Sequence, residues 1–86
     1  MKKGKNKVTV KIYGQKYTVV GEASTEHVEK IANYVNQKME EIGEKSPLLD
    51  ASRVSVLTAL NIADEYFRLQ EEYNDLLAII EEYAKE

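Results

Sequence analysis

The chain has 86 residues, enough for one small domain with a marginal hydrophobic core. It has no cysteine and a single histidine, which excludes disulfides, thiolate metal sites and thiol catalysis and argues against a zinc site. The net charge of −3 is uneven, because residues 1–20 carry six lysines and no acidic residue, whereas residues 44–86 carry ten acidic and four basic residues. No apolar run is long enough to span a bilayer and no signal peptide is recognisable, so we expect a cytoplasmic protein that gains stability by oligomerisation.

The first 20 residues predict a leader followed by a β-hairpin. Residues 1–6 are rich in lysine and have nothing to bury, which is typical of a disordered basic leader. Polar and apolar residues then alternate in two strands over 7–20, and Gly14-Gln15 between them suits a two-residue type II′ turn. The apolar face of the first strand consists of Val8, Val10 and Ile12. Since two strands alone are barely stable in water, this hairpin must pack on another element.

A first helix is expected over residues 25–42. Ser24 and Thr25 supply hydroxyls that cap its start, and we expect Gly43 to end it. Apolar residues at spacings of three and four give it one stripe, formed by Val28, Ile31, Ala32, Val35, Met39 and Ile42. The connector that follows, residues 44–49, contains a Ser-Pro turn.

A second helix is capped by Asp50 or Ser52 and continues without glycine or proline to the end of the chain, over about 50 Å. Over 54–67 apolar residues lie nearly all round it, so we expect the hairpin and the first helix to bury this part. The sequence therefore predicts an α+β fold. Its head spans residues 7–67 and consists of the hairpin, the short helix and the first part of the long helix, and residues 68–86 continue as a coiled-coil tail.

The long helix also carries a coiled-coil pattern, a strict alternation of three and four residues sustained over about four heptads. The residues of this seam are Ala59, Ile62, Tyr66, Leu69, Tyr73, Leu76, Ile80 and Tyr83. Its tyrosines fit a parallel two-stranded zipper poorly, and flanking apolar residues widen the stripe near the C-terminus. More than two helices and an antiparallel arrangement both remain open. Self-association through this seam is the main functional prediction.

Two segments together resemble a known family. The first is the opening of the hairpin, VTVKIYGQKY at residues 8–17, and the second is SRVSVL at 52–57 followed by ALNIADE at 59–65. They resemble ZapA, the bacterial cell-division family that associates with the tubulin-like FtsZ ring. For a member of this family the C-terminal helix is short, and in this the chain is similar to the compact ZapA form found in Gram-positive bacteria.

The resemblance implies a non-enzymatic accessory protein at the mid-cell division site. Such proteins dimerise through their heads, can pair dimers into antiparallel tetramers, cross-link and bundle FtsZ protofilaments, promote Z-ring assembly and lower the GTPase activity of FtsZ. The positions that match the family's FtsZ-contacting region are Lys11, Gln15, Lys16, Ser52 and Arg53. Some relatives carry arginine where this chain has Gln15, and we expect Lys16 to supply that charge.

The residues themselves argue against catalysis and cofactors. His27 has no second histidine or cysteine to form a metal site with it, and the chain lacks the glycine-rich loops that hold nucleotide phosphates. The alternative function is a coiled-coil adaptor or a nucleic-acid-associated protein that uses the basic N-terminal segment, with Tyr13 and Tyr17 stacking on bases. We expect no nucleic-acid partner, because the chain is acidic overall and has no recognised nucleic-acid motif. Membrane binding is not expected either, since anionic lipids repel an acidic helix face.

Overall fold

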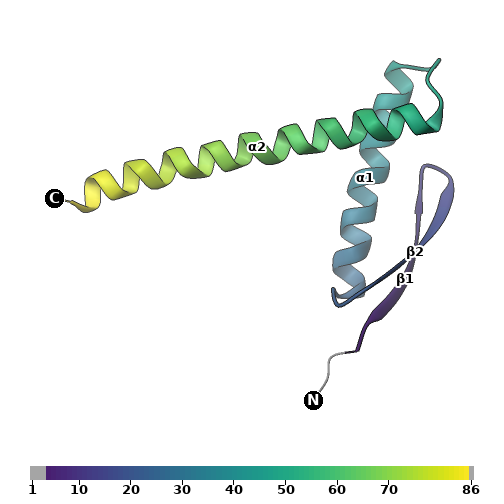
Figure 1. Ribbon diagram of the computed structural model, residues 1–86, viewed down its shortest axis with the longest axis horizontal. Helices are drawn as coiled ribbons and strands as arrows, with labels where there is room; N and C mark the ends of the chain where they lie inside the picture. Colours follow the sequence, from purple (N-terminus) through teal and green to yellow (C-terminus); the bar gives the residue numbers. More distant parts are fainter. Residues whose placement is uncertain (1–3, 86) are drawn as a thin grey trace.

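A computed structural model describes residues 4–85 and confirms the predicted α+β architecture. Its elements in chain order are β1 (Asn6–Ile12), β2 (Gln15–Gly21), α1 (Thr25–Lys45) and α2 (Ala51–Ala84) (Figure 1). The two strands form an antiparallel hairpin that packs on α1, and α2 crosses α1 and then extends far beyond it (Figure 1). The molecule measures 55 × 47 × 15 Å, so its shortest dimension is little more than the width of one helix. Within residues 4–85 there is therefore no second layer that covers the faces of α2.

The hairpin begins earlier than the sequence suggested. Residues 1–3 of the predicted disordered leader lie outside the described part of the chain, and Asn6 already belongs to β1. The Asn6 amide donates a hydrogen bond to the carbonyl of Ala23, at 2.6 Å, which ties the start of β1 to the segment before α1. The apolar face of β1 was predicted correctly, because Val8 and Val10 are buried against α1.

The turn of the hairpin differs from the prediction by one residue. Ile12 pairs with Gln15, so the two turn residues are Tyr13 and Gly14, not Gly14 and Gln15. Both have positive φ angles, 52° for Tyr13 and 82° for Gly14, which is the pattern of a type I′ turn and not of type II′. The positive φ of Tyr13 is unfavourable for a bulky side chain, so contacts from outside the hairpin must hold it.

Helix α1 starts as predicted and ends later. The Ser24 hydroxyl accepts a hydrogen bond from the backbone N–H of His27, at 3.1 Å, and so caps the first turn. The helix then continues through Gly43 to Lys45, and the prediction that Gly43 ends it is wrong. Glycine is needed there for another reason. The Tyr13 ring passes so close to the backbone of α1 that a β-carbon at position 43 would overlap the tyrosine hydroxyl.

Helix α2 is capped by Asp50, whose carboxylate accepts a hydrogen bond from the N–H of Arg53 at 2.9 Å. It continues unbroken past residue 67, where we predicted the division between head and tail, and that division stays a prediction. The prediction that the chain itself buries residues 54–67 is wrong. Only Val54 and Thr58 are buried in α2, while Val56, Leu60 and Phe67 are each more than half exposed. The reason is that α2 touches α1 along one line only, and the hairpin lies against α1 and not around α2 (Figure 1).

Candidate interaction surfaces

The tip of the hairpin is fastened to α1 at two points. The backbone N–H of Tyr13 donates a hydrogen bond to the Asn36 side-chain oxygen at 2.7 Å, and the Asn36 amide group donates to a carboxylate oxygen of Glu40 at 3.3 Å. The Tyr13 ring lies against Gly43, one to two turns further along α1. These contacts compensate for the positive φ of Tyr13 and give the tip one fixed position relative to α1.

A hollow of about 180 Å³ lies between this tip and the start of α2. It brings together Gln15 and Ser52, two of the residues that resemblance placed in the FtsZ-contacting region. Its full lining is Ile12, Tyr13, Gln15, Tyr17, Met39, Ala51, Ser52 and Ser55. Arg53 is exposed and does not line the hollow, although it follows Ser52 directly.

Three lysines share the outer face of the hairpin, the face turned away from α1. Lys11 lies directly opposite Lys16, and Lys7 lies on the same face four residues back along β1. All three are exposed, and within residues 4–85 none of them forms an ion pair. The resemblance named Lys11 and Lys16, and their role in FtsZ contact stays a prediction. Lys7 was not named, although the two-residue period of a strand places it on the same face as Lys11.

The aromatic residues of the hairpin lie on the other side. Tyr17 pairs with Val10, whose side chain is buried against α1, so Tyr17 shares the inner face. The ring of Tyr13 contacts Gly43 of α1. The two tyrosines invoked by the nucleic-acid alternative therefore do not share the face of the three lysines.

An apolar groove lies between α1 and α2 and has a volume of about 580 Å³. Its lining comes from both helices: Val35, Met39, Ser55, Thr58, Ala59, Ile62, Ala63 and Tyr66. At Tyr66 the groove joins a second apolar hollow formed by Tyr66, Leu69, Gln70 and Tyr73. The predicted seam thus begins inside the groove and continues along α2. From Tyr66 onward its residues are each more than half exposed in the single chain: Tyr66, Leu69, Tyr73, Leu76, Ile80 and Tyr83.

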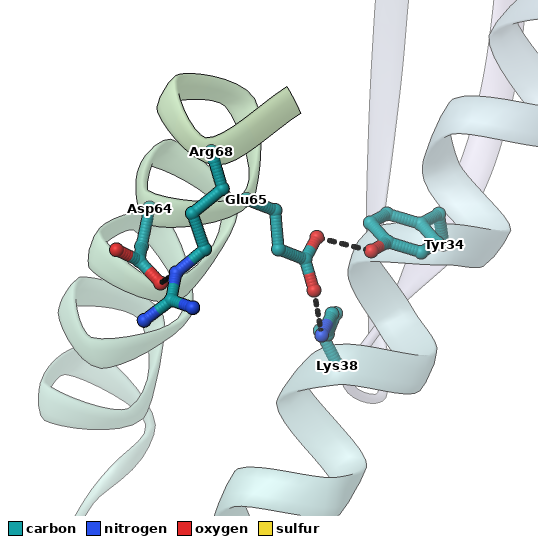
Figure 2. A network of polar contacts seen from close by, with 5 residues as sticks. All are labelled: Tyr34, Lys38, Asp64, Glu65 and Arg68. Carbon is teal, nitrogen blue, oxygen red and sulfur yellow. Dashed lines mark hydrogen bonds and ion pairs between the residues drawn. The ribbon is translucent and has the colours of Figure 1, made fainter. Parts of the chain in front are cut away.

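A cluster of three polar side chains joins the two helices at the crossing (Figure 2). One oxygen of the Glu65 carboxylate accepts a hydrogen bond from the Tyr34 hydroxyl, and the other pairs with the Lys38 ammonium. The ammonium also lies 5.6 Å from the centre of the Tyr34 ring. We call Tyr34, Lys38 and Glu65 the clamp. Sequence analysis did not identify it, because its partners lie on two different helices, far apart along the chain.

The clamp groups shift one another's protonation. The hydrogen bond from Lys38, followed by that from Tyr34, lowers the pKa of Glu65 below its ordinary value of 4.5. The hydrogen bond with Glu65 raises the pKa of Lys38, and the same carboxylate raises the pKa of Tyr34. The carboxylate and the ammonium are therefore both charged across the neutral pH range.

Comparison with known proteins identifies this arrangement. The family described as "Cell division protein ZapA" matches residues 8–86 of the chain. The chain belongs to the ZapA family. A ZapA protein from a Geobacillus species (strain WCH70) is 53% identical over 73 residues, which cover 85% of this chain and 84% of the relative. A ZapA protein from Bacillus pumilus is 47% identical over 73 residues, covering 85% and 86%.

A solved ZapA structure has the same fold. It is described as a ZapA mutant dimer from Geobacillus stearothermophilus, is 45% identical in sequence, and superposes with a TM-score of 0.73 over 93% of each chain. The resemblance to ZapA drawn from the hairpin and from residues 52–65 is thereby confirmed. The superposed 93% of the chain takes in residues of both the hairpin with α1 and the long helix α2.

Two further observations concern other kinds of site. Within residues 4–85 no group of three or more histidine, cysteine, aspartate or glutamate side chains is arranged to hold a metal ion. None of the described helices of this ZapA protein combines the length and the apolar character needed to cross a membrane.

Proposed function

We propose that this ZapA protein is a multivalent cross-linker of FtsZ filaments that acts without catalysis. Copies of the chain associate through α2, each head contacts a filament, and the assembly bundles protofilaments, promotes Z-ring assembly and lowers FtsZ GTPase activity. The protein acts in the cytoplasm at the mid-cell division site. The observation that carries this proposal is the exposure of the apolar side of α2, which a single chain leaves uncovered from Val56 to Tyr83.

The first step is pairing of two copies at the groove. A groove lined almost entirely by apolar groups is unfavourable in water, and α2 of a second copy supplies the matching apolar surface. The solved ZapA mutant from Geobacillus stearothermophilus is a dimer, which supports pairing of two copies here. Further along α2 the seam from Leu69 to Tyr83 then joins two dimers, with their helices antiparallel.

The second step is multivalent binding. Once one head of an assembly is bound, the next head binds from a high local concentration, so avidity exceeds single-site affinity by about 10²–10⁴. A helix about 50 Å long sets how far apart the linked filaments lie. Lower GTPase activity follows if bundled filaments exchange subunits more slowly, which requires no catalytic group on this chain.

The filament contact lies on the hairpin and at the start of α2. Lys11 and Lys16, together with Lys7, present a positive surface, while Gln15 and Ser52 meet at the hollow and Arg53 lies beside it. Two like charges placed directly opposite each other weaken a hairpin, so the Lys11–Lys16 pair is retained at a cost to the fold. An acidic partner surface explains that cost.

Pelleting with polymerised FtsZ tests the proposal. The wild-type chain should sediment with the polymer and increase bundling. A variant with both Lys11→Glu and Lys16→Glu should lose most of that binding, with a steep dependence on salt. Lys30→Glu combined with Lys45→Glu, which makes the same charge change at two exposed positions of α1, is the matched control and should bind like wild type. Wild-type protein that stays in the supernatant at every salt concentration would refute the proposal, and a salt-sensitive shift of DNA or RNA would then favour the nucleic-acid alternative.

A further inference from the structure

The long helix touches its own head along a single line of residues that ends at Glu65. Val54 and Thr58 are buried, Ile62 and Glu65 are half-buried, and every residue from 66 to 85 is exposed. The spacing of these four residues places them on one side of the helix. Glu65 is therefore the last point at which α1 controls the direction of α2.

The contacts before Glu65 leave that direction poorly determined. Val54, Thr58 and Ile62 lie within about two turns of one another, and the apolar contacts that they make are non-directional. The Thr58 hydroxyl bonds to the carbonyl of Val54 within the same helix, at 2.8 Å, and contributes no hydrogen bond to α1. Helix α2 is thus fastened at a pivot near its start, and the pivot alone does not fix the crossing angle.

The clamp supplies what the pivot lacks. Glu65 lies about 10 Å beyond Thr58 along the helix axis, and its two carboxylate oxygens are held separately by Tyr34 and Lys38 (Figure 2). Two donors on one carboxylate constrain its orientation as well as its distance. Tyr34 and Lys38 are themselves one turn apart on α1, so the carboxylate is aligned with the axis of that helix.

Small changes of angle at the crossing have large effects at the seam. Ala84 lies about 39 Å from Thr58 along the helix axis, so a rotation of about 10° at the pivot displaces the end of α2 by about 7 Å. Side chains that interlock in a coiled coil do not tolerate a displacement of that size. The crossing angle therefore decides whether the seam residues of two dimers meet.

Stability alone does not account for the clamp. The side chains of Lys38 and Glu65 are 20% and 39% exposed, and Tyr34 is 45% exposed. Ion pairs and hydrogen bonds at such exposed sites contribute little to the free energy of unfolding. Their directional geometry is what distinguishes them from an apolar contact at the same place.

We propose that Glu65 is a positioning residue for assembly: held by Tyr34 and Lys38, it sets the angle at which α2 leaves the head and so determines the register of the oligomer. This role in assembly rests on the proposed self-association through α2. Its first test measures distances within one chain and does not involve FtsZ.

Distance measurements between α1 and α2 test the proposal. The chain has no cysteine, so nitroxide labels can be attached to Lys30→Cys on α1 and Glu71→Cys on α2 without interference. Labelled chains diluted into unlabelled protein report only distances within one chain by double electron–electron resonance. The distribution should be single and narrow for wild type. In Glu65→Ala it should broaden or shift by about 3 Å for every 10° of rotation, because residue 71 lies about 20 Å from the pivot.

Two variants separate positioning from a general loss of structure. The charge swap Lys38→Glu with Glu65→Lys should restore a narrow distribution, which recovery of packing alone does not predict. Asp64→Ala is the matched control, since Asp64 pairs with Arg68 on the same helix at 2.8 Å and not with α1 (Figure 2). It should leave the distribution unchanged.

Native mass at several protein concentrations gives the second readout. Glu65→Ala should require a several-fold higher concentration to reach the largest assembly, and the charge swap should reverse the shift. An unchanged distance distribution in Glu65→Ala, or a change of the same size in Asp64→Ala, would overturn the proposal. If Glu65→Ala fails to fold, Tyr34→Phe and the charge swap provide the same comparison. Absence of FtsZ binding by wild type would count against the proposed function and not against the clamp.

Discussion

The hairpin with α1 and the long helix α2 differ in how far contacts within the chain bury their apolar side chains. Residues 4–45 make their own core, in which Val8 and Val10 of β1 are buried against Ala32 of α1. Helix α2 buries only Val54 and Thr58 and leaves most of its other large apolar side chains more than a third exposed. One region is specified by contacts within the chain, and the other leaves apolar surface uncovered for the proposed pairing with a second copy.

This difference relates structure to function. A helix whose apolar side was satisfied by its own head would have nothing left to pair with, and the heads would act singly. Because the crossing is short, most of α2 remains available for other chains.

The largest effect is expected at the seam. Ile80→Glu places a charge among apolar residues near the end of α2, which should separate the assembly into dimers and reduce filament bundling by about the avidity factor of 10²–10⁴. Light scattering gives the mass and pelleting gives the bundling. Glu82→Gln, two residues away and off the seam, is the control. A mass equal to wild type in Ile80→Glu would mean that the C-terminal seam does not hold the oligomer.

The crossing is tested by a pair of valines. Val54 is fully buried, so Val54→Ala should lower the free energy of unfolding by about 2 kcal/mol at any protein concentration. Val56 is 58% exposed in the single chain, so the effect of Val56→Ala should appear only at concentrations at which copies associate. Denaturant unfolding at two concentrations measures both. Equal, concentration-independent losses would mean that α2 is covered by its own head.

The hairpin tip is tested by a double-mutant cycle. Gly43→Ala forces the Tyr13 ring away from α1 and should cost about 1–2 kcal/mol, despite the better helix propensity of alanine. In a Tyr13→Gly background the obstruction is gone, and the same substitution should stabilise by about 0.5–1 kcal/mol. Thermal unfolding of the four proteins gives the coupling. A stabilising Gly43→Ala in the wild-type background would show that the tip is not fastened as described.

The outer face of the hairpin should show opposite signs for folding and binding. Lys11→Glu replaces a like-charge pair with an opposite-charge pair across from Lys16, and should stabilise the fold by about 0.5 kcal/mol. The same change should weaken FtsZ binding, because the positive surface is interrupted. Chemical unfolding and pelleting are measured on one preparation. A variant that binds FtsZ as tightly as wild type would exclude Lys11 from the contact.

The smallest effect concerns pH. The pKa of Glu65 is lower in the folded chain, so its contribution to stability is present above its ordinary value of 4.5 and is lost as pH falls through the folded value. The pKa of Lys38 is raised, so its contribution is complete below its ordinary value of 10.5 and is lost at higher pH. The difference in melting temperature between wild type and Glu65→Gln should therefore be present at pH 7 and shrink as the pH is lowered below 4.5. A difference that stays constant down to the lowest pH at which the protein folds would contradict this assignment.

Much of the fold was predictable because its signals are local. Alternation identified the inner face of β1, a hydroxyl before an acidic turn identified the start of α1, and three-four spacing identified the seam of α2. The turn was not predictable, because tyrosine in a left-handed conformation is tolerated only with the help of Asn36 and Gly43, which lie more than 20 residues away. The contact between Gly43 and the Tyr13 ring was not predictable for the same reason, because in sequence Gly43 looks like an ordinary helix terminator.

The residues of the candidate site were likewise predictable only in part from the sequence. Gln15 and Ser52 were named by resemblance, and folding brought them to one hollow. The two-residue period of β1 places Lys7 on the face of Lys11, and the strand register places Lys16 opposite Lys11, whereas Arg53 does not line the hollow. The clamp was invisible in the sequence, because charged residues on a helix surface are common and nothing local marks Glu65 as the partner of Lys38.

The sequence by itself determined the element types, their order, the family and the existence of an apolar seam, since each follows from periodicity, caps or motifs within a few residues. Only the tertiary structure decided how little of α2 the head covers, where the hairpin turns and at what angle α2 leaves α1. These depend on contacts between elements distant in sequence, whose geometry no local pattern encodes.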